Sequence, residues 1–408
     1  MADYRQRLVD DVVADLFSEL PALQIVGPRA AGKTTIGRRH AASVARLDDP
    51  ADAAVFSADP DAALRGLPEP VLIDEWQAVP SVLGAVKRSV DDDFRAGRFI
   101  LTGSVRADQQ VEGWPGTGRI VRVAMYGLTI AERLGRATRP LIDRLVDGAD
   151  LDPPPERLDL RDYLEVALHS GFPETAGMSE GARARFLSSY VDQLVFRDAA
   201  SVAPRRDPDR LRRYFEAYAV NTAGNAADAT LAEAAAVNRA TAQDYEELLT
   251  ALFVIDALPA WSSNRLRRLV RTRKRYLVEP ALLVGLLGVD VAGVMRDADL
   301  LGRVLDTFVL AQLRAEREWA KTAPRLYHVR EHDGRREIDI VAEVGARQVV
   351  GIEVKATSAP SPADARHLAW LRDQLGSDFA AGVVLHTGPR TFSLGDRITA
   401  APIGTLWA

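Results

Sequence analysis

The chain has 408 residues, of which 47% are hydrophobic and 27% are charged, a composition typical of a soluble globular protein with two or three domains. It contains no cysteine, which excludes disulfides and thiolate metal sites and favours a reducing compartment. The net charge of -5 excludes a polycation, so any nucleic-acid surface has to be a local patch.

Two segments bear on a signal sequence or a membrane span, and neither has the required composition. Residues 1–17 are charged and amphipathic and lack an apolar signal core. The most apolar stretch, residues 276–295, is interrupted by Glu279 and Asp290 and is too short and too charged to span a bilayer. We therefore expect a cytoplasmic protein without a membrane partner.

Residues 22–47 are predicted to form a strand, a glycine-rich turn and a helix. Gly27, Gly32, Lys33 and Thr34 match the phosphate-binding spacing G-x-x-x-x-G-K-[ST], in which backbone amides and a helix N-terminus surround phosphate oxygens. Lys33 is expected to supply a point charge to the β- and γ-phosphates, and Thr34 a Mg²⁺ ligand. The alternative is a glycine-rich turn without a ligand. The residues predicted to bind ATP here are Gly27, Arg29, Ala31, Gly32, Lys33, Thr34 and Thr35.

Two further apolar strands end in polar residues. Residues 70–75 end in Asp74 and Glu75, and we expect Asp74 to hold Mg²⁺ and Glu75 to act as the base that orients the attacking water. Residues 98–105 contain Thr102 and Ser104, and a polar group there can contact the γ-phosphate or the water. The alternatives are a solvated acidic turn for the first strand and a helix N-cap for the second.

These segments, together with residues 118–134 and 170–174, resemble the AAA+-type ATPases of bacteria and archaea that are usually described only as ATP-binding proteins. The resemblance implies a nucleotide site at Gly32, Lys33, Thr34, Asp74, Glu75 and Ser104. It also implies an arginine from the same or a neighbouring subunit, for which Arg119 and Arg197 are candidates. The alternative for each arginine is a structural ion pair. A site shared between subunits makes a homo-oligomer plausible.

A proline-rich, acidic segment near residue 150 separates this part from a helical middle. Residues 229–261 are predicted to form a short helix, a turn with Thr241 as N-cap and a longer helix, followed by a strand. A second strand follows at 265–280. Two helices and two strands in this order look like a winged helix.

Seven of the eleven residues from 265 to 275 are basic: Arg265, Arg267, Arg268, Arg271, Arg273, Lys274 and Arg275. Alternate residues of a strand share a face, so a cationic stripe facing the phosphate backbone of a nucleic acid is predicted from the residues of one parity, Arg265, Arg267, Arg271, Arg273 and Arg275, with DNA as the expected partner. The alternative is an edge hairpin whose basic residues protect it from aggregation.

The last third is predicted to contain a helix with Asp306, three strands, a second helix and a fourth strand. Asp339 lies in the second strand, and Glu353 and Lys355 share a face of the third. This order resembles the PD-(D/E)XK nuclease superfamily. The resemblance implies that Asp306, Asp339 and Glu353 hold Mg²⁺ while Lys355 acts on water or phosphate. Asp306 departs from the glutamate usual in the family, and the alternative is an inactive nuclease-like scaffold.

Lysine is rare, since only five of the 52 basic residues are lysine: Lys33, Lys87, Lys274, Lys321 and Lys355. An ammonium is a compact charge whose pKa shifts on burial, unlike that of a guanidinium. We interpret the lysines at positions 33 and 355 as point charges that act on phosphate.

We therefore expect an α/β protein with a P-loop AAA+-type ATPase module at 1–150, a helical and winged-helix module at 151–295 and a nuclease-like module at 296–408. The expected function is a Mg²⁺-dependent ATPase that binds DNA and couples hydrolysis to remodelling, translocation, unwinding or cleavage. The alternative is a nucleotide-controlled binding switch with an inactive nuclease-like scaffold.

Overall fold

The computed structural model describes residues 4–104, 116–203, 206–262, 272–331 and 334–408, which divide into two compact units. Unit 1 comprises residues 1–127 with the short segments 172–174 and 251–253. Unit 2 comprises residues 128–171, 175–250 and 254–408. The chain thus leaves the first unit at Gly127, earlier than the predicted boundary near residue 150, and the predicted middle and C-terminal modules lie in one unit.

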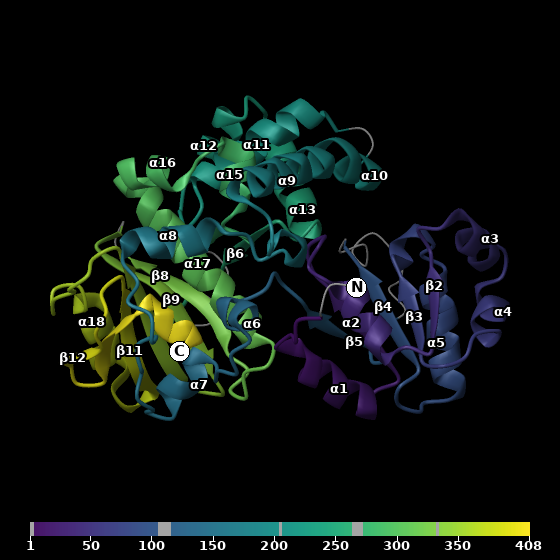
Figure 1. Ribbon diagram of the computed structural model, residues 1–408, viewed down its shortest axis with the longest axis horizontal. Coiled ribbons are helices and arrows are strands. Elements are labelled where there is room, and N and C mark those ends of the chain that lie inside the picture. The colour runs from purple at the N-terminus through teal and green to yellow at the C-terminus, as the bar shows by residue number, and fades with distance from the viewer. Residues whose placement is uncertain (1–3, 105–115, 204–205, 263–271, 332–333) are drawn as a thin grey trace. The chain divides into compact units, whose positions relative to one another are not determined.

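Unit 1 is built on a five-stranded sheet with the order β2-β3-β4-β1-β5, in which every pairing is parallel. Helix α3 lies next to β2 (Figure 1). The elements are α1 (Val9–Glu19), β1 (Ala22–Val26), α2 (Lys33–His40), β2 (Ser43–Arg46), α3 (Pro50–Ala58), α4 (Pro60–Arg65), β3 (Val71–Asp74), α5 (Val82–Asp92), β4 (Phe99–Gly103) and β5 (Ile120–Ala124).

One core cluster of unit 1 joins α1 and α2 to the sheet. Val9, Val13 and Phe17 follow the spacing of one helix face and pack against Leu23 and Ile25 of β1. The strands β1, β3 and β4 are buried at every position, as expected for parallel strands covered on both faces. This packing fixes the carboxyl ends of the three strands beside one another.

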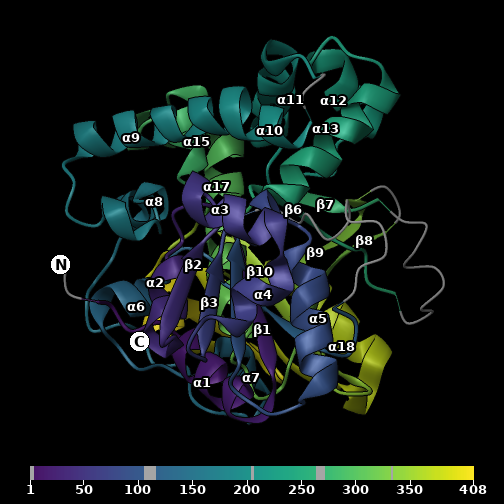
Figure 2. The ribbon, with the colours of Figure 1, turned by 90° about the vertical axis from the view of Figure 1, so that its right-hand side faces the viewer.

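Before its six-stranded sheet, unit 2 contains the helices α6 (Ile130–Leu134), α7 (Leu141–Val146), α8 (Leu160–Leu168), α9 (Glu180–Gln193), a π-helix (Leu194–Asp198), α10 (Ala199–Val202), α11 (Pro208–Val220), α12 (Asp228–Ala234), α13 (Arg239–Ala251), α15 (Leu282–Leu287), α16 (Val291–Arg296) and α17 (Ala298–Arg317). Helices α9, α11, α13 and α15 gather at one end of the unit (Figures 1 and 2).

The order helix, turn, helix, strand, strand expected in the middle is present as α12, α13, β6 (Ile255–Leu258) and β7 (Lys274–Leu277), and β6 and β7 pair antiparallel. One detail of the prediction is wrong: α13 begins at Arg239, before Thr241. Asn238 supplies the cap instead, since its Oδ1 accepts the backbone N–H of Thr241 at 2.8 Å.

The second sheet has six strands in the order β12-β13-β11-β10-β9-β8. Its elements are β8 (Arg325–Glu331), β9 (Arg336–Val344), β10 (Gln348–Lys355), α18 (Arg366–Leu375), β11 (Phe379–His386), β12 (Phe392–Gly395) and β13 (Ile398–Pro402). Strands β8, β9 and β10 pair antiparallel, whereas β11 runs parallel to β10. The expected order of one helix, three strands, a helix and a strand is therefore present as α17, β8, β9, β10, α18 and β11.

Hydrogen bonds between segments far apart in the sequence explain why the predicted middle and C-terminal modules form one unit. Trp261 donates its backbone N–H to His328 at 2.7 Å, and His328 donates to Pro259 at 3.1 Å, so the chain after β6 runs along β8. In the part of unit 2 before the helical middle, Arg144 donates to the carbonyl of Thr405 at 2.6 Å. Such tertiary contacts leave no signal in a local sequence pattern.

Candidate functional site

The loop between β1 and α2 adopts a conformation that its glycines permit. Gly27 has a φ of 152°, and a Cβ there would lie 1.9 Å from the carbonyl oxygen of Met125. Gly32, which precedes α2, has a φ of 95°. Both glycines of the predicted phosphate-binding spacing are therefore required by the backbone, as the motif demands.

Lys33 is the first residue of α2, and its ammonium lies inside the loop. Its Nζ donates to the carbonyl oxygens of Gly27 at 2.9 Å and Pro28 at 2.7 Å. The side chain is 5% exposed, and burial lowers the pKa of Lys33 to about 8, although the carboxylate of Glu75 opposes this shift. A buried cation is thus held where a helix N-terminus already favours an anion.

Strand register brings the polar strand ends together. Asp74 of β3 lies opposite Thr102 of β4, and Val26 of β1 lies opposite Gly103, which also belongs to β4. Thr102 donates its hydroxyl to Asp74 Oδ1 at 2.5 Å, and Thr34 donates to the same oxygen at 2.8 Å. Asp74 is therefore oriented by one hydroxyl from the sheet and one from the loop helix.

Glu75 follows β3 in a left-handed backbone conformation, with a φ of 53°. Gln77 donates to its Oε2, and Ser104 donates to Oε1 at 3.4 Å. A non-glycine residue with this φ stores strain that the surrounding structure must hold, as is common at functional sites. A Cβ on Gly103 would lie 2.5 Å from Gln77 Oε1, so glycine at this position makes room for Gln77.

Sequence reasoning missed Arg7, which fixes the loop from outside. Its side chain is 6% exposed. Nη1 donates to the carbonyl of Ala31 at 2.7 Å, and Nη2 donates to the carbonyls of Tyr126 at 2.7 Å and Gly127 at 3.3 Å. One guanidinium thus joins the phosphate-binding loop to the end of β5. No signal marked Arg7 in a chain so rich in arginine, whereas Gln77 lies only two residues after Glu75 at the predicted strand end.

Some of the remaining residues predicted to contact the nucleotide lie at the loop, whereas Arg119 lies far from it. Arg29 and Thr35 are exposed at the loop and on α2, and Ala31 is buried with its carbonyl bound by Arg7. Arg119 precedes β5 at the amino end of the sheet, because Ile120 pairs with Ala22, and its Nε donates to Asp91.

The prediction that Arg119 completes the site of its own subunit is wrong, since four residues of strand, roughly 13 Å, separate the two edges of the sheet. Arg197 lies exposed on the π-helix of unit 2.

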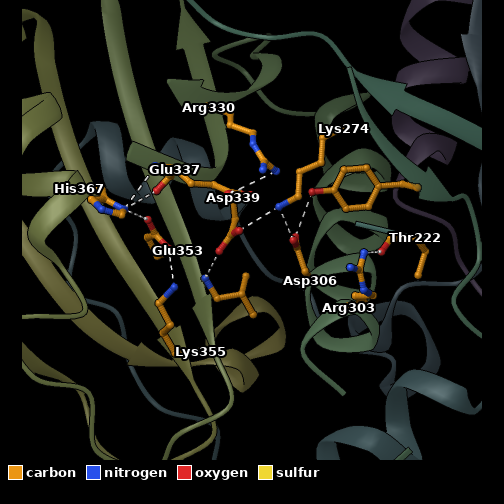
Figure 3. Close-up of polar contacts among 12 residues, drawn as sticks. Thr222, Lys274, Arg303, Asp306, Arg330, Glu337, Asp339, Glu353, Lys355 and His367 are labelled. Atoms are coloured by element: carbon orange, nitrogen blue, oxygen red, sulfur yellow. Dashed lines mark hydrogen bonds and ion pairs between the residues drawn. The ribbon is translucent and has the colours of Figure 1, made fainter. Parts of the chain in front are cut away.

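A second group of charges lies in unit 2 around Lys274 (Figure 3). Lys274 Nζ is 2.5 Å from Asp306 Oδ2 and 2.9 Å from Asp339 Oδ1, and the residue is 1% exposed. Tyr276 donates its hydroxyl to Asp306 Oδ1 at 3.1 Å. Burial lowers the pKa of Lys274, but the two carboxylates overcome this and hold it well above its ordinary value.

Asp339 lies where β9 and β10 stop pairing. The last paired residues are Ile340 and Ile352, and beyond them Val354 donates its backbone N–H to Asp339 Oδ2 at 3.0 Å. The side chain thus replaces the backbone acceptor that the diverging strand no longer supplies. Although burial opposes it, the ammonium groups of Lys274 and Lys355 hold the pKa of Asp339 well below its ordinary value.

Glu353 and Lys355 share a face of β10, and their Oε2 and Nζ atoms lie 2.7 Å apart. Glu353 is 3% exposed, and its Oε1 has no hydrogen-bond partner among the described residues. Burial and the neighbouring charge of Asp339 raise the pKa of Glu353 well above its ordinary value. His367 Nδ1 is 3.9 Å from Glu353 Oε1 and bonds the carbonyl of Glu337 at 2.7 Å.

The prediction that Asp306, Asp339 and Glu353 form a metal site is not met. Within the described ranges, no group of three or more histidine, aspartate or glutamate side chains is disposed to hold a metal ion. The physical reason is visible in Figure 3, where an ammonium lies between the two aspartates and a second ammonium pairs with Glu353.

The prediction for the basic run at 265–275 is tested only at its end, because Arg265, Arg267, Arg268 and Arg271 lie outside the described residues. Arg273 is exposed, but Lys274 and Arg275 are 1% and 4% exposed. Arg275 forms ion pairs with Asp228 and Glu246 and donates to the carbonyl of Ala226. The prediction is therefore wrong for Lys274 and Arg275, because β7 is buried on both faces within unit 2.

Three segments match known protein families. Residues 20–134 match a family described as an AAA domain, and residues 160–292 and 301–406 each match a domain of unknown function, DUF8612 and DUF4143. The parallel sheet, the glycine-rich loop and the polar strand ends of the described residues within 20–134 agree with the AAA match and support an AAA-like P-loop fold, the coarser part of the expected resemblance. Among the described residues, no helix has the length and apolar character needed to span a bilayer.

Two curated relatives are similar to most of the chain. They are the uncharacterized proteins Rv2008c of Mycobacterium tuberculosis and Mb2031c of Mycobacterium bovis, each 29% identical over 94% of this chain and 80% of the relative. Among solved structures, a point mutant of Thermotoga maritima RuvB is 19% identical over 66% of this chain and 88% of that chain. Its TM-score is 0.29, which is too low to assign a shared fold.

Proposed function

We propose that the chain hydrolyses ATP at the site formed by the loop Gly27–Thr34 and the carboxyl ends of β3 and β4. The observation that carries this proposal is the convergence of Thr34 and Thr102 on one oxygen of Asp74. A loop threonine and a strand-end carboxylate meet in this way where a nucleotide phosphate and its metal ion are bound. The family match of residues 20–134 supports the same reaction.

Each group of the site has a proposed role. Lys33 binds the β- and γ-phosphates, because it is a buried point charge beside the loop amides. Thr34 and Asp74 would hold Mg²⁺, and their oxygen atoms, 2.8 Å apart, suit a hard cation. When bound, that ion supplies charge stabilisation at the phosphates.

Glu75 is the proposed general base. It follows the strand end directly, and Gln77 and Ser104 hold its two carboxylate oxygens. A carboxylate so fixed can accept a proton from water and orient it toward a phosphate. Ser104 follows Gly103, which lies opposite Val26 of β1, and is proposed to contact the same water.

We further propose that a nucleic acid, DNA in the first instance, is the partner whose binding is coupled to hydrolysis. Five arginines between residues 265 and 273 support this, and Arg273, the one described, is exposed. Such a segment suits backbone phosphates without sequence preference. The helices α12 and α13 followed by β6 and β7 give the order of a winged helix, which supports the same partner.

Regulated binding without cleavage is the favoured form of this coupling. The order of α17, β8, β9, β10, α18 and β11 supports a nuclease-like fold for the C-terminal part. The pairing of its predicted metal ligands with Lys274 and Lys355 favours a scaffold over a nuclease. A homo-oligomer in which Arg119 or Arg197 of one subunit completes the site of the next remains part of the proposal.

The test measures binding of fluorescent double- and single-stranded DNA as salt is raised. The variant Arg265→Gln/Arg267→Gln/Arg273→Gln should weaken binding and reduce its salt dependence, because about three phosphate contacts are removed. The control Arg157→Gln/Arg296→Gln/Arg347→Gln removes the same charge from exposed positions of unit 2 and should leave binding unchanged. Equal binding by both variants would refute the nucleic-acid proposal and leave ATP hydrolysis as a separate question.

A further inference from the structure

We propose that Lys274 occupies the place of a divalent cation in the C-terminal charged cluster, so that unit 2 carries an internal counter-ion instead of a metal site. The proposal concerns Lys274, Asp306 and Asp339 and does not rest on ATP hydrolysis. It goes beyond the proposed scaffold role, because it names the side chain that replaces the metal and predicts that one substitution creates a metal site.

Every carboxylate oxygen of the two aspartates already has a protein donor. Asp306 Oδ2 and Asp339 Oδ1 both accept from Lys274, at 2.5 and 2.9 Å. Asp306 Oδ1 accepts from the hydroxyl of Tyr276, and Asp339 Oδ2 accepts from the backbone N–H of Val354. The four oxygens that these two aspartates could offer to a metal ion are therefore all engaged (Figure 3).

Strand β7 supplies two side-chain donors, Lys274 and Tyr276, to this cluster. Lys274 and Tyr276 lie two residues apart and so share a face of the strand. The ammonium approaches both aspartates, while the tyrosine hydroxyl approaches the far oxygen of Asp306. Helix α17 supplies Asp306 and β9 supplies Asp339, so the cluster joins three elements of unit 2.

Charge balance explains why a cation is needed at this point. Two carboxylates that meet in a buried site repel each other unless a positive charge lies between them. A divalent ion binds carboxylate oxygens at about 2.0–2.6 Å. The ammonium of Lys274 is bonded to one oxygen of each aspartate and would keep an ion from reaching that distance. Glu353, the third predicted ligand, is paired with Lys355 at 2.7 Å, so two ammonium groups serve three acids.

The cluster is reachable from solvent, so burial alone would not exclude an ion. It borders a cavity of about 390 Å³ lined by Lys274, Arg303, Asp306, Arg330, Asp339 and Lys355, among others. Asp339 retains 16% exposure of its side chain. The lining holds four cationic groups and four acidic ones, the latter being Asp299, Asp306, Glu337 and Asp339, so a metal ion that entered would compete with the cationic groups for carboxylates.

The test is a titration of the full chain with Mn²⁺ alone, without nucleotide, followed by electron paramagnetic resonance. Wild type and Asp339→Asn should bind the same number of Mn²⁺ ions, because Asp339 holds none. Lys274→Met should gain one Mn²⁺ site, and Lys274→Met/Asp339→Asn should lose it again. Lys321→Met, which removes an exposed lysine of unit 2, should gain none.

The Tm of the same samples, measured by thermal unfolding, provides a second test. Removing Lys274 leaves two uncompensated carboxylates, so Lys274→Met should have a lower Tm, and millimolar Mn²⁺ should restore part of the loss. Wild type should show no such Mn²⁺-dependent rise. If Lys274→Met does not fold, wild type and Asp339→Asn still decide the matter: a wild-type Mn²⁺ site that Asp339→Asn abolishes would overturn the proposal. A folded Lys274→Met that binds no additional Mn²⁺ would also overturn it.

Discussion

Thr102 and Asp74 lie opposite each other on parallel strands β4 and β3, and the threonine hydroxyl donates to the carboxylate across 2.5 Å. Both residues are buried, with 1% and 4% exposure. Asp74 is the proposed metal-side carboxylate. The hydroxyl of Thr102 orients this carboxylate before any nucleotide binds.

Thr102→Val keeps the shape of the side chain and removes the hydroxyl. The loss of a hydrogen bond to a buried carboxylate should destabilise the protein by about 1–3 kcal/mol and lower kcat, because Asp74 loses one of its two orienting donors. Chemical denaturation and steady-state ATP hydrolysis measure the two effects. Thr117→Val, at an exposed position of unit 1, should change neither. An unchanged kcat in Thr102→Val would remove Thr102 from the site.

Glu75→Gln should separate binding from hydrolysis. The amide cannot accept a proton from water, so kcat should fall by about 10²–10⁴-fold while the nucleotide still binds. Hydrolysis assays together with titration of a fluorescent ATP analogue give both quantities. Glu19→Gln removes an exposed carboxylate of the same unit and should behave as wild type. Loss of nucleotide binding in Glu75→Gln would instead show that Glu75 has a structural role.

Gly27→Ala tests the backbone of the loop. The new Cβ would lie 1.9 Å from Met125 O at a φ of 152°, so the loop must move and nucleotide affinity should fall at least tenfold, with a stability loss of about 1–3 kcal/mol. Gly118→Ala is matched in having a positive φ, 77°, but no atom within 4 Å of its Cβ. It should cost less and leave affinity unchanged. Similar effects of both changes would mean that the loop does not depend on this close approach.

Glu316 predicts a pH dependence of stability in unit 2. Burial raises the pKa of Glu316 to about 7, from an ordinary value of 4.5, although Arg144 opposes the shift. Between these values the folded state holds a proton that the unfolded state has lost, so stability decreases as pH rises from about 4.5 to about 7. The difference corresponds to about 3 kcal/mol.

Glu316→Gln is always neutral and retains an oxygen for the backbone N–H of Leu141, which Glu316 Oε2 now accepts at 2.8 Å. The plot of Tm against pH should therefore become shallower over this range. Glu233→Gln, at an exposed position, should leave the slope as in wild type. An unaltered slope in Glu316→Gln would contradict the assignment of this titration to Glu316.

The residues of the proposed nucleotide site were easier to predict as neighbours than those of the second cluster, because they lie close in sequence to strand ends. Gly27, Gly32 and Lys33 follow one strand directly, and Asp74 ends another, so the parallel sheet brings them together without further information. Arg7 was not predictable, since its three acceptors are backbone carbonyls and nothing in a sequence marks them.

Lys274 was misassigned because a run of basic residues was treated as one surface strand. Strand β7 begins at Lys274 and is buried at all four positions, so the run divides there. The rarity of lysine was the signal that could have separated Lys274 from its arginine neighbours. Three of the five lysines, Lys33, Lys274 and Lys355, lie in the two charged sites. The ammonium of Lys274 is bound by two carboxylates and not by a phosphate.

The most direct test of the account is Mg²⁺-dependent ATP hydrolysis by the purified full chain beside Lys33→Ala, with Lys87→Ala as the control. Lys87 is a partly exposed lysine of unit 1 that pairs with Asp91. We predict hydrolysis by wild type and Lys87→Ala, and a loss on the order of 10²-fold or more in Lys33→Ala. Equal hydrolysis by Lys33→Ala and wild type, or none by any of the three while they remain folded, would contradict the assignment of an ATPase site to the loop and the ends of β3 and β4.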